Sequence, residues 1–555
     1  MRQHALKEII MYKALFPVLV CAAVLCTEGA ARKKAIGCGW GFNNVTVDDF
    51  LANAESFDAT GLDGVLVWLR GKDAAGKPVG MRNIYYEDWS CEMFAPMVPK
   101  LRKMTEHAAF RDNFLITLRA PRKRIAWNDD AAWSRVAENM RVAACIARDG
   151  GCRGLHMDTE DYSRAYQFSW RPGDPGYDEL CKLVRRRGAE VFRGVFREYP
   201  EAVVLSFWFL SMGNDGCPER CVESSARARG TLWPAFINGI LDVMPPQARL
   251  VDGNGNAYRY EADRNDFYRS ACHVRKSLVP LVAPENREKY ARQMQVGFGL
   301  YLDMYINPTN SPWYFPPTDG SRLETFCRNF EQAMDAADEY VWIYGEKRQF
   351  VKWPPGFKLG RFNPLRWEDE LPGFADAIFS VKDPDAFARR RRAELEASGS
   401  LTNLVPNGDC AVCVAGKVPK PFGSWQPGDK ANHRGTFGCD TAFGDGDSTS
   451  LCAEGVPSGC FAYTIKGVTP GRMYLVKCSA SGGATSASVA WKDAKGRYLR
   501  TASQHMTFGR EEGRWRRGEI AVRVPAGAAA MQIAFGVSLA PGEKAWFDSI
   551  GVFGL

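Results

Sequence analysis

Three carboxylates stand within four positions of the segment GLHMDTEDY, residues 154–162: Asp158, Glu160 and Asp161. They follow a short apolar run of the kind that forms a buried strand. An unpaired charge is costly there, so these groups either belong to a solvated loop or are held in place for proton transfer. Partial desolvation and the charge of Asp158 would raise the pKa of Glu160 and make it a general acid. We expect Asp161, on the opposite face, to be structural.

Acids and aromatic residues also stand near the ends of other apolar runs. Alternate residues of a strand share a side, which aligns His156 with Asp158 and Glu160, Tyr301 with Asp303 and Tyr305, and Trp342 with Tyr344 and Glu346; Trp68 and Asp252 lie near the ends of two further runs. Cleavage of a glycosidic bond requires a proton donor, a second carboxylate and flat rings that stack on sugars. The alternative is that each acid pairs with an arginine.

These residues receive the following predicted roles. The predicted catalytic residues are Glu160, Asp158, Asp303 and Glu346. Glu160 is the proton donor, and Asp303 is preferred to Glu346 as the second catalytic carboxylate. The predicted substrate-binding residues are Trp68, Asp252, Tyr305, Trp342 and Tyr344. We expect His156 to be a hydrogen-bonded residue of the barrel interior rather than a metal ligand.

The elements that must position these residues alternate between apolar β-rich runs and amphipathic helices. Eight runs are candidate strands, and they begin at residues 35, 61, 113, 154, 202, 249, 296 and 339. Helices are expected over residues 46–57, 129–151 and 176–200 from their caps and glycine or proline ends. Eight strand-helix units predict a (β/α)₈ TIM barrel over residues 32–380. A doubly wound open sheet is the alternative, but no strand is followed by a Gly-rich dinucleotide fingerprint.

The pattern changes after the barrel. Residues 381–402 contain a charged helix and then small polar residues, which predicts a linker. Short β-runs separated by turn signals over residues 403–555 predict an all-β jelly-roll sandwich. Trp425, Trp491 and Trp515 are its candidate sugar-stacking residues, and the first and last are preferred. The alternative for each is a position in the core, and Trp491, in the run SASVAWKD, fits that alternative best.

Two resemblances sharpen these expectations. The motifs NLVPNGD, GVTPGRMYLVKCSASG, VAWKDAKGRYL and AWFDSIGVFG resemble a galactose-binding-like, CenC-type carbohydrate-binding module. That resemblance implies a structural calcium at Asp409 and Asp548. The stretch GGCRGLHMDTE resembles the strand-4 signature of chitinase-like family 18 glycosidases, which implies that Glu160 is the acid and that Asp158 orients a substrate acetamide. Comparison with retaining glycosidases instead pairs Glu160 with Asp303.

Other kinds of chemistry have weaker support. The chain has six histidines, and His156 is the one on a predicted barrel strand, which disfavours a multi-histidine zinc centre. No GxSxG, P-loop or HExxH motif occurs. The net charge of +8 is modest for 555 residues and widely spread, so nucleic acid is not an expected partner. No cofactor for catalysis is expected.

The N-terminus indicates export. Residues 1–31 have a charged region, an apolar stretch of about 13 residues and then small residues, the layout of a secretory signal peptide rather than of a membrane span. Of the 17 cysteines, most are expected to be buried thiols, with one or two disulfides.

The sequence therefore predicts a secreted, periplasmic or cell-surface glycoside hydrolase with an appended glycan-binding module and no transmembrane segment. One alternative is a catalytically inactive barrel that binds glycans, because the run VDGNGNAY offers amides where further acids would be expected. Another is a barrel enzyme of a different hydrolase class.

Overall fold

The computed structural model describes residues 33–39, 42, 45–80, 84–212, 218–318, 321–354, 357, 364–500 and 503–555. The predicted signal peptide, residues 1–31, lies outside these ranges. The chain divides into two compact units. The barrel unit contains the described residues up to Asp303 and Glu331–Arg366, and the sandwich unit contains Met304–Phe330 and Trp367–Leu555.

Parallel strands form the barrel unit, and their sheet runs in the order β10-β11-β1-β2-β5-β6-β7-β8-β9. The strands are β1 (Lys34–Gly39), β2 (Gly64–Trp68), β5 (Phe114–Arg119), β6 (Gly154–Asp158), β7 (Val203–Ser206), β8 (Arg249–Asp252), β9 (Met294–Val296), β10 (Phe298–Tyr301) and β11 (Tyr340–Gly345). Most of their residues are buried, as expected of parallel strands that are covered on both faces. Two short strands outside this sheet, β3 (Arg70–Lys72) and β4 (Pro78–Gly80), form a hairpin.

The two ends of this sheet are the halves of one bent strand. β9 pairs with β8 and β10 pairs with β11, and Gly297 alone separates the two halves. A Cβ atom on Gly297 would lie 2.8 Å from the carbonyl oxygen of Tyr340, so the bend requires glycine. The predicted barrel of eight strands is therefore confirmed, with its seventh strand bent in the middle.

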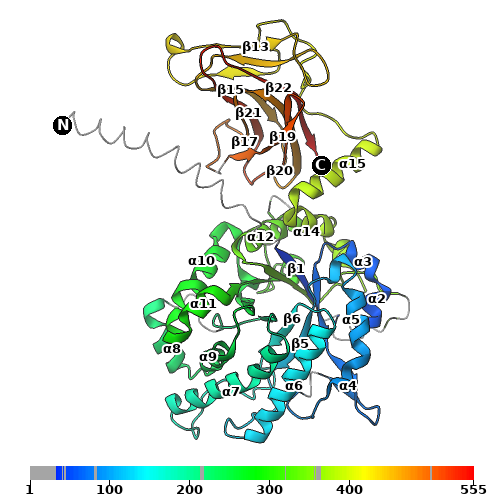
Figure 1. The fold of residues 1–555 in the computed structure, drawn as a ribbon, viewed down its shortest axis with the longest axis vertical. Coiled ribbons are helices and arrows are strands. Elements are labelled where there is room, and N and C mark those ends of the chain that lie inside the picture. The colour runs from blue at the N-terminus through cyan, green and yellow to red at the C-terminus, as the bar shows by residue number, and fades with distance from the viewer. Residues whose placement is uncertain are drawn as a thin grey trace, which may run out of the picture. The chain divides into compact units, whose positions relative to one another are not determined.

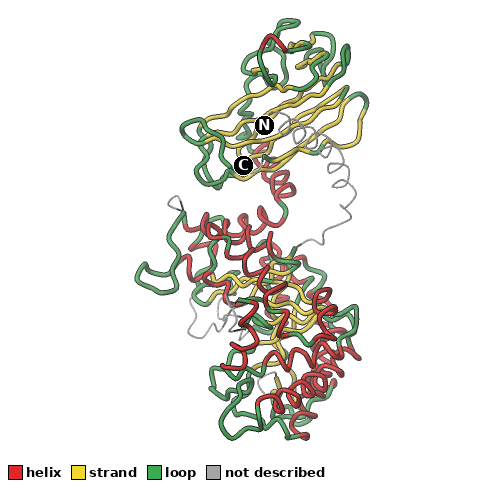
Figure 2. The backbone as a smooth tube through the Cα atoms, turned by 90° about the vertical axis from the view of Figure 1, so that its left-hand side faces the viewer, coloured by secondary structure: helices red, strands yellow, loops and turns green. Residues whose placement is uncertain are grey.

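Helices connect the strands, and Figure 2 shows the strands of the barrel unit enclosed by them. They are α2 (Val47–Ala52), α3 (Ala54–Asp58), α4 (Cys91–Phe94), α5 (Val98–Met104), α6 (Asp130–Asp149), α7 (Tyr177–Glu198), α8 (Val222–Ala228), α9 (Trp233–Val243), α10 (Asp266–Cys272) and α11 (Arg287–Gln293). A further helix, α12 (Arg322–Ala336), belongs in part to each unit. Figure 1 shows the two longest, α6 and α7, side by side. The predicted N-cap Thr46 forms a capping box with Asp49, and Asp129 caps α6.

The sandwich unit contains two antiparallel sheets, which confirms the predicted β-sandwich. One has the order β12-β15-β21-β17-β18 and the other β13-β14-β22-β16-β20-β19. The strands are β12 (Gly423–Trp425), β13 (Thr436–Asp440), β14 (Ser450–Glu454), β15 (Gly459–Lys466), β16 (Met473–Gly482), β17 (Ala484–Lys492), β18 (Gln504–Met506), β19 (Phe508–Glu512), β20 (Trp515–Arg523), β21 (Ala530–Ser538) and β22 (Lys544–Gly554). Side chains of both sheets, including Phe461, Phe535 and Phe547, form one core.

The predicted linker contains a helix. Three helices precede the sandwich strands: α13 (Trp367–Glu370), α14 (Phe374–Lys382) and α15 (Pro384–Ala397). Ala388 of α15 packs in a cluster with Leu475 and Ala521, and the carboxylate of Asp385 accepts a hydrogen bond from the backbone N–H of Ala521. The segment 381–402 is therefore more than a flexible connector, because α15 packs on strands β16 and β20.

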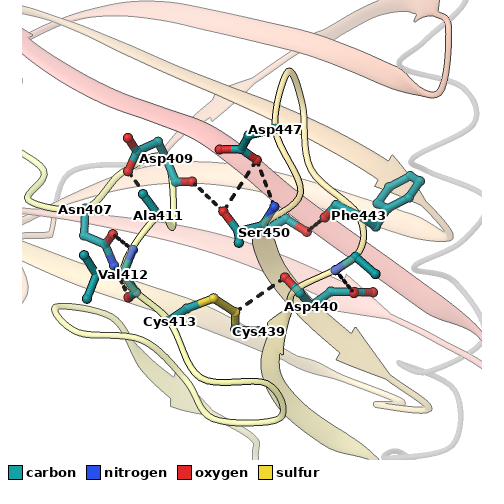
Figure 3. Close-up of a disulfide and its surroundings, with 12 residues drawn as sticks. Asn407, Asp409, Ala411, Val412, Cys413, Cys439, Asp440, Phe443, Asp447 and Ser450 are labelled. Atoms are coloured by element: carbon teal, nitrogen blue, oxygen red, sulfur yellow. Dashed lines mark hydrogen bonds between the residues drawn. A yellow bond between two sulfur atoms is a disulfide. The ribbon is translucent and has the colours of Figure 1, made fainter.

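One disulfide joins Cys413 to Cys439, a residue of the edge strand β13 (Figure 3). Of the twelve free cysteines in the described ranges, five are buried, six are half-buried and one is exposed, so fewer are buried than expected. Across those same ranges, no helix has both the length and the apolar composition that a membrane span needs.

Candidate active site

The strand β6 carries the acidic segment to the end of the barrel sheet. All five of its residues are buried, and Asp158 is its last residue. Gly154, at its start, allows close pairing with β7, because a Cβ atom there would lie 1.9 Å from the carbonyl oxygen of Val203. Glu160 follows two residues after the strand ends and is half-buried.

Asp158 forms an ion pair with Arg119, the last residue of the neighbouring strand β5. Their side chains lie 2.8 Å apart, and the two residues are partners in the strand register. Burial raises the pKa of Asp158, and Arg119 opposes that shift. The Arg119 guanidinium also lies over the ring of Trp68, 5.5 Å from its centroid. The expected alternative, pairing with an arginine, thus holds for Asp158, and Trp68 supports that arginine.

Glu160 has the electrostatic environment of a proton donor. Its pKa is raised from 4.5 to about 7, chiefly by burial and next by the charge of Asp158. A hydrogen bond from Tyr162 and the charge of Arg119 act in the opposite direction, whereas the charge of Glu346 adds to the rise. Burial and Asp158 are the two causes expected from the sequence. A carboxyl group with this pKa is protonated in about half of the molecules near neutral pH.

Tyr162 is a site residue that the sequence analysis did not select. Its hydroxyl donates a hydrogen bond of 2.8 Å to Oε1 of Glu160, although its side chain is 71% exposed. The sequence could have indicated it, because Tyr162 is an aromatic residue two positions after Glu160, in a loop that follows a strand. Aromatic residues in such loops often bind ligands.

A pocket of about 240 Å³ opens beside Glu160. Its walls come from the segment after β5 and the segment after β6, and it is lined by Tyr85, Arg119, Ala120, Pro121, Arg122, Glu160, Tyr162 and Ser163. Asp161 does not belong to this lining, and its carboxylate accepts hydrogen bonds from the backbone N–H groups of Ala165 and Tyr166. As expected, Asp161 caps the next segment of the chain.

Glu346 supplies a second carboxylate near Glu160. It follows β11 directly, is exposed, and accepts a hydrogen bond of 2.9 Å from the hydroxyl of Tyr344. Its charge contributes to the raised pKa of Glu160, so the two groups lie within electrostatic reach. Tyr344 stacks on Tyr258 and Tyr301, with ring centroids 5.9 Å and 5.5 Å apart. Tyr258, from the turn after β8, is another residue that the sequence analysis missed.

Asp303 does not have the environment predicted for it. Its side chain is fully buried, and its two oxygens accept hydrogen bonds from the backbone N–H groups of Glu346, at 2.7 Å, and Lys347, at 3.1 Å. Burial raises its pKa to about 6. Asp303 therefore holds the turn that carries Glu346, and the geometry favours Glu346 as the second carboxylate.

Asp252 and Tyr305 also have structural positions. The buried Asp252 accepts hydrogen bonds from the N–H and the hydroxyl of Ser211, at 2.9 Å and 2.6 Å. Tyr305 belongs to the sandwich unit, where its buried ring packs on Phe315 and Phe326. The alternation that aligned Tyr305 with Asp303 fails because the strand ends at Tyr301 and a 3₁₀ turn, Leu302–Tyr305, follows.

Trp342 and His156 lie inside the barrel and not on its surface. Trp342 is 1% exposed, stacks on Phe207 with ring centroids 4.5 Å apart, and donates a hydrogen bond to the carbonyl oxygen of Gly253. It cannot stack on a sugar in this position. His156 packs against Phe207, and neither ring nitrogen has a hydrogen-bond partner among the described residues, contrary to our expectation. Burial lowers its pKa to about 3, so the imidazole is neutral.

The three tryptophans chosen in the sandwich have different environments. Trp425 on β12 is 60% exposed, which suits a stacking residue. Trp515 is 6% exposed and stacks on Phe443, so its predicted role in sugar stacking is wrong. Trp491 lies in the core, as expected. Tyr498, which was not selected, is 59% exposed and donates a hydrogen bond to Gln532.

Small side chains cover the outer face of the sheet that contains β12. The residues Phe461, Phe535 and Val489 face the core, so their strand neighbours face outward. In the strand register these outward residues form rows of small and polar side chains: Cys460, Ala462, Thr464, Gln532, Ala534, Gly536, Ser486, Ser488 and Ala490. Trp425, paired with Cys460, stands at one edge of this face, and Tyr498 contacts Gln532 within it.

Of the two predicted calcium ligands, Asp409 lies in the surroundings of the disulfide (Figure 3). Asp409 is exposed and its carboxylate accepts a hydrogen bond from the N–H of Ala411 (Figure 3). Asp548 is buried and accepts backbone hydrogen bonds from Asp445 and Ser549, and burial raises its pKa to about 7. Within the described ranges, no group of three or more metal-binding side chains is assembled. Calcium at Asp409 and Asp548 stays a prediction.

The sequence matches no family model and no curated protein. Among solved structures, the enzymatically active domain of bacteriophage CBA120 tailspike protein 4 is 22% identical, with a TM-score of 0.23, over 28% of this chain and 21% of that chain. A family 16 carbohydrate-binding module is 14% identical, with a TM-score of 0.20, over 27% of this chain and 99% of that one. TmCBM61 in complex with β-1,4-galactotriose is 16% identical, with a TM-score of 0.20, over 28% and 99%. At these values, the likenesses assign no activity to this chain.

Proposed function

We propose that this protein is an exported glycoside hydrolase whose barrel cleaves a polysaccharide or oligosaccharide and whose sandwich binds glycan. The observation that carries the proposal is Glu160. This carboxyl group, with a pKa raised to about 7, lines an open pocket at the end of a barrel strand. Barrel enzymes act at the carboxyl ends of their strands, and a protonated carboxyl group near neutral pH is what the leaving oxygen of a glycoside needs.

The roles follow from the contacts. Glu160 donates its proton to the glycosidic oxygen, and Tyr162 holds the carboxyl group through its hydroxyl. Glu346 is the second carboxylate, which attacks the anomeric carbon or activates a water molecule. Asp303 positions Glu346 through two backbone hydrogen bonds. Arg119 opposes the rise that burial causes in the pKa of Asp158, and a negative charge on Asp158 favours the protonated form of Glu160.

The sandwich contributes a face for glycan binding. The residues of β15, β21 and β17 that face outward are small, so a glycan chain can lie against the outer face of this sheet. Trp425 has an exposed ring at the edge of that face. Aromatic rings and polar side chains on a shallow surface suit sugar rings, which have one apolar face and many hydroxyl groups.

Release of reducing sugar from a panel of polysaccharides tests the proposal. Wild type should act on at least one member, and Glu160→Gln should lower the rate of that release by about 10² to 10⁴. Glu106→Gln is the matched control, because Glu106 is exposed and precedes β5, at the other end of the strands from the pocket. A wild type that binds glycans and releases no sugar would instead support the inactive, glycan-binding barrel.

A further inference from the structure

We infer that the pocket beside Glu160 takes a negatively charged sugar residue, and that Arg122 binds its carboxylate or sulfate group. This inference rests on the proposed function, since it names the substrate class of the same site. It is carried by the charges that line the pocket and by the way in which the loop after β5 is held.

The pocket lining has an excess of positive charge. Arg119 and Arg122 are its cations and Glu160 is its acid. Arg119 is already neutralised by Asp158 at 2.8 Å. Arg122 is exposed, and no carboxylate within the described ranges pairs with its guanidinium. Near neutral pH, Glu160 carries a negative charge in only part of the molecules, because burial and Asp158 favour its protonated form, so it compensates the charge of Arg122 only in part.

The neighbouring residues strengthen this excess. Lys123 follows Arg122, and Arg164 follows Ser163 of the pocket lining; both are exposed and neither has a carboxylate partner in the described part of the chain. In contrast, Arg124 is paired with Asp174 at 2.8 Å. Cations on two loops around one concave site raise the local concentration of anionic ligands.

The loop that carries Arg122 is fixed at both ends. The hydroxyl of Tyr86 accepts hydrogen bonds from the backbone N–H groups of Arg122, at 2.9 Å, and Lys123, at 3.2 Å. The hydroxyl of Tyr85 donates a hydrogen bond of 2.6 Å to the carbonyl oxygen of Arg119. A guanidinium on a fixed backbone suits the two oxygens of a carboxylate or sulfate, which it binds bidentately.

Binding of matched acidic and neutral oligosaccharides tests the inference. The full chain with Glu160→Gln, which prevents turnover, is titrated calorimetrically with oligogalacturonate, oligoalginate, hyaluronan oligosaccharides and sulfated carrageenan oligosaccharides. Each acidic probe is compared with its carboxyl-reduced or desulfated form. At least one acidic probe should bind about tenfold or more tightly than its neutral form, and the strongest class identifies carboxylate or sulfate as the anion.

Substitutions locate the anionic subsite. Arg122→Ala should remove most of the preference for the acidic probe. Arg122→Lys should retain part of it, because lysine keeps the positive charge but cannot form the bidentate hydrogen bonds of a guanidinium. Arg111→Ala is the matched control: Arg111 is exposed and lies before the start of β5, at the opposite end of that strand. Circular dichroism confirms that each variant is folded.

The outcomes separate the two proposals. Equal binding of acidic and neutral forms, no binding of any acidic probe, or the same effect of Arg122→Ala and Arg111→Ala would overturn the anionic subsite. Acidic binding that depends on Arg122, with no release of reducing sugar by wild type from the same oligosaccharide, would keep the anionic subsite and count against hydrolysis. Cleavage of neutral glycans alone would support the proposed hydrolase activity and would overturn the proposal that its substrate is acidic.

Discussion

The barrel and the sandwich present their candidate binding groups in different ways. In the barrel, Glu160, Tyr162 and Glu346 all lie beyond the last residue of a strand, in the loops that follow β6 and β11. In the sandwich, the outward residues of β15, β17 and β21 lie within the strands. A barrel site thus depends on how each loop is anchored, whereas a sandwich face follows from alternation along each strand.

Anchoring also divides the acids of the barrel into two groups. Asp252 and Asp303 are fully buried and accept backbone hydrogen bonds, so they fix loops. Glu160 and Glu346 bind tyrosine hydroxyls and remain accessible. The difference predicts that the first group affects stability and the second affects turnover.

The largest expected effect is that of Glu160→Gln on turnover. Loss of a general acid lowers the rate by about 10² to 10⁴, and the nearly isosteric amide should leave the fold intact. The pKa of Glu160 is raised from 4.5 to about 7, so folding favours its protonated form and the wild type loses stability as the pH rises through that interval. Above this interval the variant should unfold at the same temperature as wild type or at a higher one. Calorimetry and initial rates measure both; a less stable variant at alkaline pH would contradict the assignment.

Next is the contrast between Asp303 and Glu346. Asp303→Ala leaves two backbone N–H groups without their acceptor, which costs at most about 1–3 kcal/mol for each because these hydrogen bonds are partly buried, and it displaces Glu346. We expect a lower free energy of unfolding together with lower turnover. Glu346→Gln should lower turnover at unchanged stability. Urea unfolding distinguishes them, and a Glu346→Gln variant as unstable as Asp303→Ala would remove the distinction.

A smaller effect is expected in the sandwich. Trp425→Ala should weaken glycan binding roughly tenfold without loss of stability, because the ring is 60% exposed. Trp515→Ala serves as its counterpart: this ring is buried against Phe443, so its loss should lower stability by about 3 kcal/mol or more. Affinity electrophoresis and thermal unfolding of the full chain give both values. Unchanged glycan affinity in Trp425→Ala would reject this face as the binding surface.

The smallest effect is expected from Tyr162→Phe. The hydroxyl of Tyr162 lowers the pKa of Glu160, so its removal should raise that pKa above about 7. Because the acid acts in its protonated form, the alkaline limb of the rate profile should move to higher pH. The other groups that act on Glu160, namely Asp158, Arg119 and Glu346, are unchanged. A limb that moves to lower pH would show that Tyr162 acts in another way.

The prediction from sequence succeeded where a local pattern decides the outcome. The alternation of apolar strands and capped helices predicted the barrel, and β-runs with turn signals predicted the sandwich. Glu160 was selected because two acids beside a buried strand give a recognisable pattern. Its role as proton donor stays a prediction, whereas burial and the Asp158 charge do raise its pKa as expected. Asp161, placed on the opposite side, does cap its own loop.

Only the tertiary structure could decide the rest, because alternation describes a strand and says nothing of where the strand ends. β10 stops at Tyr301, so Asp303 turns towards the backbone of Glu346 and Tyr305 packs elsewhere. The sequence does not distinguish the environments of Trp515 and Trp425, yet the ring of Trp515 is buried against Phe443. Glu346, the proposed second carboxylate, and the residues that line the pocket of Glu160 come from segments that are distant in sequence. Barrel closure and the anchoring of loops bring these segments together, and no local sequence pattern does so.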